Sequence, residues 1–152
     1  MAIKKGDQCP KFTLKDQNGE QFNIEDVLGK KNFVLYFYPK DDSPGCTRQA
    51  CSFKDAFEDF VEIGAQVIGI SSDDEESHKK FAEKYNLPFT LLADSQKKVR
   101  KMFDVPTNLL GLIPGRVTYV IDKKGIVKGI FNSQMYFDKH VSEAMKILKS
   151  LK

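Results

Sequence analysis

The stretch from Phe33 to Cys51 reads FVLYFYPKDDSPGCTRQAC, and it decides the fold around it. It opens with a short apolar run, Phe33–Tyr38, of the kind that forms a buried strand. A Ser-Pro-Gly turn follows at 43–45, and after it we expect a helix over about Thr47–Ile63. Cys46 is therefore predicted at the first turn of a helix, just past the carboxyl end of a buried strand. Unpaired N–H groups and the positive end of the helix dipole favour a thiolate there, and the thiolate is the nucleophilic form of cysteine.

A second cysteine, Cys51, lies on the same predicted helix. Residues five apart on a helix are offset by about 140° and about 7.5 Å, which puts their Cα atoms roughly 8–9 Å apart. A disulfide requires a Cα separation below about 7 Å. Cys46 and Cys51 therefore cannot be joined while the helix is intact. This spacing suits a cysteine that reacts first and is captured by the second after the first turns unwind.

The bulk composition predicts one domain over residues 1–152. The hydrophobic fraction is 41% and there are 12 Phe, which is enough to fill a core at this length. Lys and Arg total 24 against 21 Asp and Glu, and a net charge of +3 is too small to predict binding to nucleic acid or to a membrane surface. The densest basic cluster, Lys97–Lys101, is typical of the solvated face of a helix. No apolar stretch approaches the ~20 residues of a transmembrane helix.

The cysteine count and the first residues bear on the compartment. Three cysteines do not make a secreted disulfide framework, and Met1–Gly6 lacks the apolar core of a signal peptide. We therefore expect a reducing compartment, with the cytoplasm as the simplest choice. A mature organelle protein, for example from a plastid, would look the same once its leader had been removed.

Periodicity and turn signals predict the remaining elements in alternating order. The expected strands and helices are an N-terminal hairpin over Lys11–Lys15 and Gln21–Ile24, a strand over Gln66–Ser71, a helix that a capping box at Ser72–Glu75 opens and that runs to Tyr85, a strand over Phe89–Ala93, a helix over Ser95–Met102, a hairpin over Val117–Ile121 and Ile126–Phe131, and a helix over Asp138–Leu151. This order indicates an α/β domain with a central mixed sheet flanked by helices. A reactive cysteine at a helix start, followed later by a hairpin and a last helix, is the thioredoxin-like arrangement, here with an N-terminal β-hairpin extension.

The residues also fit a family pattern. Pro39, Ser43 and Cys46 stand in the Pro-x-x-x-(Thr/Ser)-x-x-Cys pattern of peroxiredoxins. The longer string around them resembles the bacterioferritin-comigratory-protein, or peroxiredoxin Q, subfamily. The segments Gly6–Leu14 and Pro114–Asp122 resemble the same subfamily, so the resemblance covers nearly the whole chain.

The resemblance implies roles for five residues. Cys46 matches the peroxidatic cysteine and Cys51 the resolving cysteine. Arg116 matches the arginine that holds the thiolate and the peroxide. Ser43 keeps the hydroxyl of the commoner threonine, and Pro39 helps to fix and shield the turn. Chemically, peroxide cleavage requires a thiolate and stabilisation of charge on the leaving oxygen, which a permanent cation such as arginine supplies.

Other residues near the motif receive no role. Gln49 stands where many relatives carry Glu, which puts any role for an acid there in doubt. Cys9 stands where the family usually has a small residue, and we expect it to be a buried structural cysteine. Neither His78 nor His140 has a metal-ligand spacing with the cysteines, so no metal is expected. The apolar stretch Leu109–Ile113 either belongs to the core or walls the site or a docking surface.

The implied activity is a thiol-dependent peroxidase that reduces hydrogen peroxide and organic hydroperoxides and uses no cofactor. Attack leaves a sulfenic acid on Cys46, which condenses with Cys51, and thioredoxin or a similar dithiol reduces the disulfide. No cysteine follows position 51, so a C-terminal resolving cysteine on a partner subunit is not expected. This favours a monomer, with a weak dimer as the alternative.

Two other functions compete with this prediction. The first is a thiol–disulfide oxidoreductase without peroxide chemistry, although such enzymes usually carry the C-x-x-C spacing that bridges across an intact helix start. The second is a non-enzymatic thioredoxin-like binding module, which would have no fast-reacting thiol at neutral pH.

Overall fold

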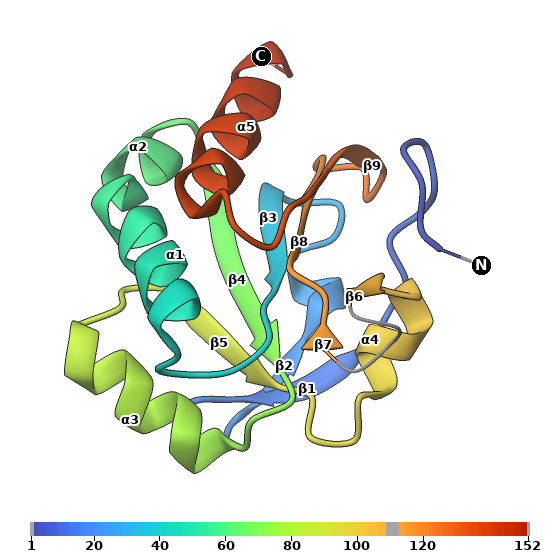
Figure 1. The fold of residues 1–152 in the computed structure, drawn as a ribbon. Helices are drawn as coiled ribbons and strands as arrows, with labels where there is room; N and C mark the ends of the chain where they lie inside the picture. Colours follow the sequence, from blue (N-terminus) through green and yellow to red (C-terminus); the bar gives the residue numbers. More distant parts are fainter. Residues whose placement is uncertain (1, 109–112, 152) are drawn as a thin grey trace.

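A seven-stranded mixed sheet runs through the computed structural model, which describes residues 2–108 and 113–151 (Figure 1). The strand order is β2-β1-β5-β4-β3-β8-β9, and β6 and β7 form a separate small sheet. The strands are β1 (Thr13–Asp16), β2 (Gln21–Asn23), β3 (Asn32–Phe37), β4 (Ala65–Ser71), β5 (Thr90–Ala93), β6 (Thr107–Asn108), β7 (Ile113–Pro114), β8 (Val117–Ile121) and β9 (Val127–Asn132). The helices are η1 (Ile24–Asp26), α1 (Pro44–Asp55), α2 (Phe57–Glu62), α3 (Glu75–Tyr85), α4 (Lys98–Phe103) and α5 (Phe137–Ser150).

The central strand β3 has a buried side chain at nearly every position because the sheet is covered on both faces. It pairs in parallel with β4 and antiparallel with β8. Successive side chains of a strand point to opposite faces. Phe33, Leu35 and Phe37 therefore enter one core, and Val34 and Tyr36 enter the other.

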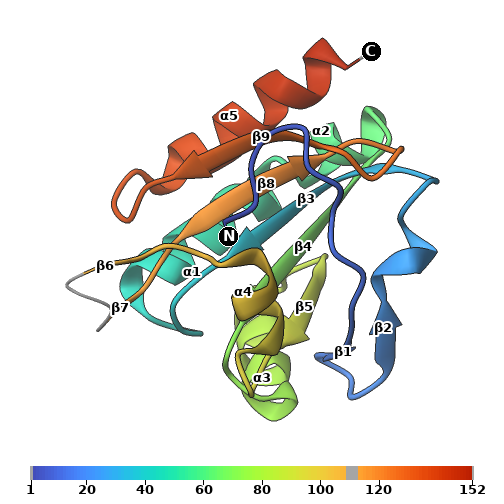
Figure 2. The same cartoon turned by 90° about the vertical axis from the view of Figure 1, so that its right-hand side faces the viewer.

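The two cores have different covers, and Figure 1 and Figure 2 show α4 on the opposite side of the sheet from α1 and α5. The first core contains Cys46 and side chains of α1, α2, α3 and α5. The second contains Cys9 and side chains of the N-terminal segment and α4. The two buried cysteines thus lie on opposite faces of the sheet.

The thioredoxin-like α/β fold expected from the sequence is confirmed. The N-terminal hairpin does more than extend it, because β1 pairs antiparallel with β5 and joins the main sheet. α3 ends where expected, with Asn86 in the left-handed conformation as its C-cap. Among the described residues, no helix has both the length and the apolar character to cross a bilayer.

Four local expectations were wrong. The helix expected from Ser95 begins only at Lys98, because Lys97 before it has a left-handed backbone. The helix after the Ser-Pro-Gly turn begins at Pro44, whose ring pre-sets the first helical position, and it breaks at Ala56 between α1 and α2. The N-cap of α3 is Asp74, whose carboxylate accepts the N–H of Ser77, and not Ser72. The basic cluster is not wholly solvated, because Arg100 is only 7% exposed.

A buried histidine on α5 makes acid stability the first test of this fold. His140 lies between Thr118, whose hydroxyl is 2.7 Å from Nδ1, and the carbonyl of Ser133, 2.7 Å from Nε2. Burial lowers its pKa to about 4, with the charge of Arg116 acting in the same direction and the Ser133 carbonyl opposing it. The unfolded chain takes up this proton below about pH 6.5, so folding loses stability as the pH falls from there to about 4.

We predict that His140 alone removes roughly 3 kcal/mol of unfolding free energy across that range. His140→Gln retains hydrogen-bonding groups but has no proton to gain. Urea unfolding of both proteins at about pH 7 and about pH 4.5 measures the difference, because other titrating groups are shared. Equal losses of stability in the two proteins would contradict the assignment.

Candidate active site

The first turn of α1 carries Cys46, which is only 1% exposed. Ser43 is the N-cap and has an extended backbone, but its hydroxyl donates to the carbonyl of Lys40 at 3.0 Å and does not cap the helix. No side chain caps this end of α1. The first-turn N–H groups therefore keep their donor capacity for an anion beside Cys46. Pro39 lies half-buried in the loop that leads to this turn.

Arg116 immediately precedes β8 and is 4% exposed. Its Nη1 donates to Oε1 of Gln49 at 2.6 Å, and its Nε donates to the carbonyl of Gln134 at 3.3 Å. Its guanidinium carbon lies 4.9 Å from the centroid of the Phe137 ring. Contacts from α1, from the segment after β9 and from α5 thus fix the direction of this permanent cation.

The lack of a side chain at Gly45 lets Arg116 lie close to the turn that carries Cys46. A Cβ atom at Gly45 would lie 2.7 Å from the Phe137 ring and 3.1 Å from Nη2 of Arg116. Both distances are shorter than ordinary van der Waals contact, so the absence of a side chain lets Arg116 and Phe137 press against the first turn. Since Gly45 is the neighbour of Cys46, the structure joins two predicted site residues that are far apart in the sequence.

Gln49 is fully buried on the same helix and contacts Arg116 directly. The guanidinium has donors only, so the amide oxygen of Gln49 must face it. Its Nε2 then has no hydrogen-bond partner, although it is buried. A neutral amide in this place orients Arg116 without cancelling its charge. The sequence singled out position 49 only for lacking an acid, and the structure shows it as the support of the arginine.

Cys51 is half-buried and lies with Cys46 inside the uninterrupted helix α1, and both are free thiols. The outer side of α1 is attached to α5 through Asp138, which accepts a 2.6 Å hydrogen bond from Ser52 and lies 3.9 Å from Arg48. The side chain of Arg48 is 68% exposed, which agrees with a surface residue. Unwinding of α1 would have to break the contacts to Asp138.

Two buried groups near the site were not predicted. Arg100 donates to the carbonyls of Gly115 and Tyr38, both at 3.3 Å, so Arg116 is not alone as a buried cation. Burial lowers the pKa of Arg100, while Asp94, Tyr119 and Cys46 oppose the shift. The second group is the hydroxyl of Tyr36, which is buried without a partner in the core beneath α1. Burial raises the pKa of Tyr36, and the positive charge of Arg116 acts in the opposite direction.

Cys9 differs from Cys46 in both place and chemistry. It is buried on the other face of the sheet, and its thiol lies 3.5 Å from the carbonyl of Pro10. Burial raises its pKa to about 12, so the thiol stays protonated at neutral pH and is a poor nucleophile. These properties agree with the structural role expected for it.

In the part of the chain that the structure describes, no group of possible metal ligands includes a cysteine. Among the described residues, one group of possible ligands comes together, Asp41, Asp73 and His78, with donor atoms within 4.8 Å of one another. Their oxygen and nitrogen atoms already hydrogen-bond within the protein. Of the apolar stretch Leu109–Ile113, residues 109–112 lie outside the described residues.

A hollow of about 250 Å³ opens beside the Arg116 side of the site. It is lined by Arg48, Phe137 and their neighbours, including Met135 and Tyr136, which are 73% and 62% exposed. Because the Phe137 ring also touches Gly45, this apolar rim is continuous with the turn that carries Cys46.

Most of the chain is similar in sequence to known proteins. Residues 5–130 match the model of the AhpC/TSA family. This chain belongs to that family. A chloroplastic peroxiredoxin Q of Populus jackii is 53% identical over 149 residues, which cover 98% of this chain and 70% of the relative. The chloroplastic peroxiredoxin Q of Arabidopsis thaliana is 54% identical over 148 residues, with coverage of 97% and 68%.

Solved structures of peroxiredoxins have the same fold as this chain. Peroxidoxin BcpB from Mycobacterium tuberculosis superposes with a TM-score of 0.91 at 36% identity and covers 99% of both chains. A cysteine-to-serine mutant of PrxQ from Xylella fastidiosa superposes with a TM-score of 0.90 at 27% identity, with coverage of 99% and 98%. The peroxiredoxin resemblance seen in the sequence is confirmed, and with it a thiol-dependent peroxidase activity.

The contact at Gly45 predicts a selective loss of rate. Gly45→Ala would push Phe137 and Arg116 away from the first turn, and we expect the reaction with peroxide to slow about 10- to 100-fold because the cation is misplaced. The measurement is the single-turnover rate of peroxide consumption by the reduced protein. The matched control is Gly19→Ala, where the added Cβ meets open space and the positive φ of 77° carries only a conformational cost. A normal rate in Gly45→Ala would show that this contact does not place Arg116.

Proposed function

We propose that Cys46 is the peroxidatic nucleophile of this peroxidase and that Cys51 is its resolving cysteine. The observation that supports this most directly is the junction at Gly45, where Arg116 meets the uncapped first turn that carries Cys46. The turn supplies N–H donors and the arginine supplies a fixed positive charge, which are the two things a peroxide-cleaving thiolate requires.

The proposed first step is an in-line displacement. The Cys46 thiolate attacks one peroxide oxygen, an S–O bond forms and the O–O bond breaks. The other oxygen leaves with the electron pair, takes a proton and departs as water or an alcohol, and Cys46 becomes a sulfenic acid. Arg116 stabilises the charge on the leaving oxygen. Ser43 keeps lone pairs that accept from the peroxide O–H, since its own proton is donated to the carbonyl of Lys40, and Pro39 shields the turn.

The second step is closure of the disulfide. The Cys51 thiolate attacks the sulfenic sulfur, an S–S bond forms and the S–O bond breaks, and the departing hydroxide takes a proton and leaves as water. α1 must unwind for this, which costs a few kcal/mol in hydrogen bonds and in the burial of Ala50 and Phe53. An external dithiol of the thioredoxin type then restores both thiols by exchange.

The substrates we propose are hydrogen peroxide and organic hydroperoxides. The exposed Met135 and Tyr136 lie beside Phe137, whose ring meets the first turn of α1 at Gly45, and would offer an alkyl group an apolar surface at the edge of the site. We propose a monomer, with a weak dimer as the alternative, and no nucleic-acid or membrane partner. The two plant relatives named above are chloroplastic proteins, which supports the plastid alternative.

The roles of the three cysteines are tested by single substitutions. Cys46→Ser should abolish peroxide consumption, because neither of the other two thiols lies at the junction with Arg116. Cys51→Ser should cleave one equivalent of peroxide and then stall as a sulfenic acid that over-oxidises readily. Cys9→Ala is the control and should turn over with thioredoxin at nearly the wild-type rate. Mass spectrometry after one equivalent of peroxide reads out each state, and residual turnover in Cys46→Ser would overturn the assignment.

The resolving step predicts a local change of structure. In the oxidised protein, we expect amides 47–53 to lose protection from hydrogen exchange, because the helical Cα separation of roughly 8–9 Å exceeds the disulfide limit. Amides of β3 and β4 should stay protected and serve as the internal reference. Equal protection of 47–53 in the two redox states would mean that the Cys46–Cys51 bond does not form.

A further inference from the structure

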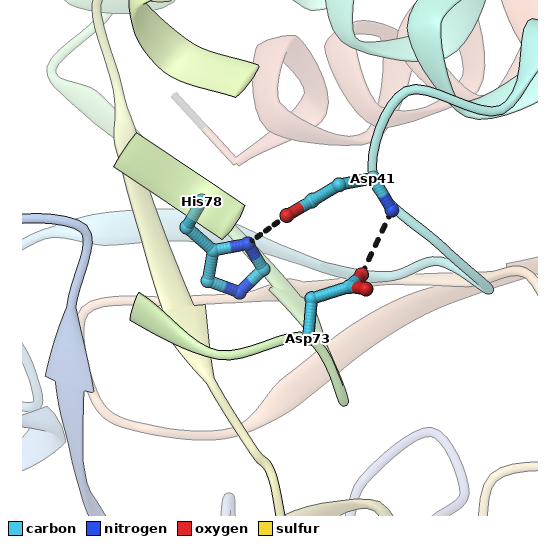
Figure 3. A group of neighbouring side chains, drawn as sticks. All are labelled: Asp41, Asp73 and His78. Atoms are coloured by element: carbon cyan, nitrogen blue, oxygen red, sulfur yellow. Dashed lines mark hydrogen bonds and ion pairs between the residues drawn. The ribbon is translucent and has the colours of Figure 1, made fainter. Parts of the chain in front are cut away.

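A buried polar cluster lies beneath the loop that joins β3 to α1. Asp41 belongs to this loop, and His78 lies on α3, where Figure 3 shows its ring directed at the Asp41 carboxylate. Asp41 is 7% exposed and His78 is fully buried. None of the chemistry above uses these two residues, and buried ionisable groups require a compensating interaction.

Both carboxylate oxygens of Asp41 and its backbone N–H have hydrogen-bond partners. Its Oδ1 accepts from the hydroxyl of Tyr38 at 2.6 Å. Its Oδ2 lies 2.6 Å from Nδ1 of His78 and accepts from Ser77 at 2.8 Å. Its backbone N–H donates to the carboxylate of Asp73 at 2.8 Å. One loop residue is thus attached to the end of β3, to the segment after β4 and to α3.

The proton of the central contact follows from the partners of His78. Nε2 lies 2.9 Å from the carbonyl of Leu92, which only accepts, so Nε2 carries a hydrogen. Nδ1 faces the carboxylate of Asp41, which has no hydrogen of its own when ionised. The 2.6 Å contact therefore encloses one proton, as an imidazolium–carboxylate pair or its neutral equivalent. In either form the shared proton joins the two side chains by a short, strong hydrogen bond.

The same contacts argue against a metal ion. The His78 nitrogens are committed to Asp41 and Leu92, and Oδ2 of Asp73 accepts from Ser71 as well as from the Asp41 backbone. A cation would have to replace these hydrogen bonds. The hydrogen bonds of the cluster hold Asp41, and with it the loop, in place.

A second, exposed attachment lies beside the first. Asp42 has a left-handed backbone with φ of 59°, and its carboxylate accepts from Lys84 and from the hydroxyl of Tyr85, both at 2.8 Å. The side chain of Lys84 is 58% exposed and that of Asp42 is 45% exposed. Because water screens the two charges, this ion pair contributes little to stability. The buried Asp41–His78 contact is the stronger of the two links from the loop to α3.

We propose that the Asp41–His78 pair positions the peroxide site by holding the loop that sets the start of α1. This inference rests on the proposed role of Cys46. No side chain caps α1, so the place of its first turn depends on the backbone that leads into it. Holding Asp41 fixes Ser43, Gly45 and Cys46 against Arg116. Asp41 precedes α1 in the chain, so this contact holds the end of the loop that leads into the helix.

The test compares single-turnover peroxide rates of folded, reduced variants. His78→Phe leaves Asp41 without its main donor, and we expect the rate to fall about 10- to 100-fold, as for a misplaced reacting group. Ser77→Ala removes a single contact near the surface and is expected to fold, with a loss of about threefold. Hydrogen exchange at Asp41 and Asp42 should quicken in both variants.

Two further variants separate positioning from charge and from stability. Asp41→Asn can keep the hydrogen-bonded shape with a neutral His78, so its rate should return to within about threefold of wild type. Leu148→Ala opens a cavity in the same core, on α5, and should destabilise the protein without slowing the reaction. Wild-type rates in His78→Phe and Ser77→Ala, or a loss in Asp41→Asn as large as in His78→Phe, would overturn the inference. A wrong assignment of Cys46 would give a different result, because the Cys46→Ser variant would then still consume peroxide.

Discussion

The peroxide site depends on one constraint, which is that Cys46 and Cys51 share an uninterrupted helix. The first turn of that helix gives Cys46 its N–H donors, so the proposed attack on peroxide requires α1 to be folded. The proposed disulfide requires α1 to be open, because helical geometry keeps the two Cα atoms too far apart. The same segment must therefore be stable enough to prepare the thiolate and weak enough to open after it has reacted.

The contacts of α1 are distributed in keeping with this requirement. Its inner face is anchored by apolar side chains, with Phe53 stacked on Tyr36 at a centroid distance of 4.5 Å. Its outer face is held to α5 by exposed polar contacts around Asp138, which are weak in water. The N-terminal end has no side-chain cap, although a good cap would add about 1 kcal/mol to the helix. Stability that the helix could have gained is therefore absent at the end that carries Cys46.

Two buried cations lie near the start of α1. Arg116 is held by Gln49 and Phe137, and Arg100 by two backbone carbonyls, so both cations are oriented by groups other than a carboxylate. Because buried charges are costly when unpaired, such an arrangement stores favourable interaction for an anion that arrives at the site. The Asp41–His78 contact gives the loop before α1 a matching rigidity.

The sequence by itself predicted most of the helices and strands and pointed to the cysteine that we propose as the reactive group. The apolar run Phe33–Tyr38, the Ser-Pro-Gly turn and the helical spacing of the two cysteines depend on local geometry, which neighbouring residues set. The order of such local patterns was enough for the fold class, whereas the family and the part expected of Arg116 came from the resemblance of the motifs. Local signals failed where two capping residues compete for one helix start, as at Ser72 and Asp74, because the side-chain partners of each were not known.

Only the tertiary structure decided which groups meet. The contact of Gly45 with Phe137 and Arg116, the support of Arg116 by Gln49, and the burial of Arg100 join segments that are remote in the chain. His78 looked like an ordinary helix residue, and its partner Asp41 like a turn residue. Hydrogen bonding between distant segments leaves no periodic trace in a sequence, since each partner needs only to be polar and in reach once the core has packed.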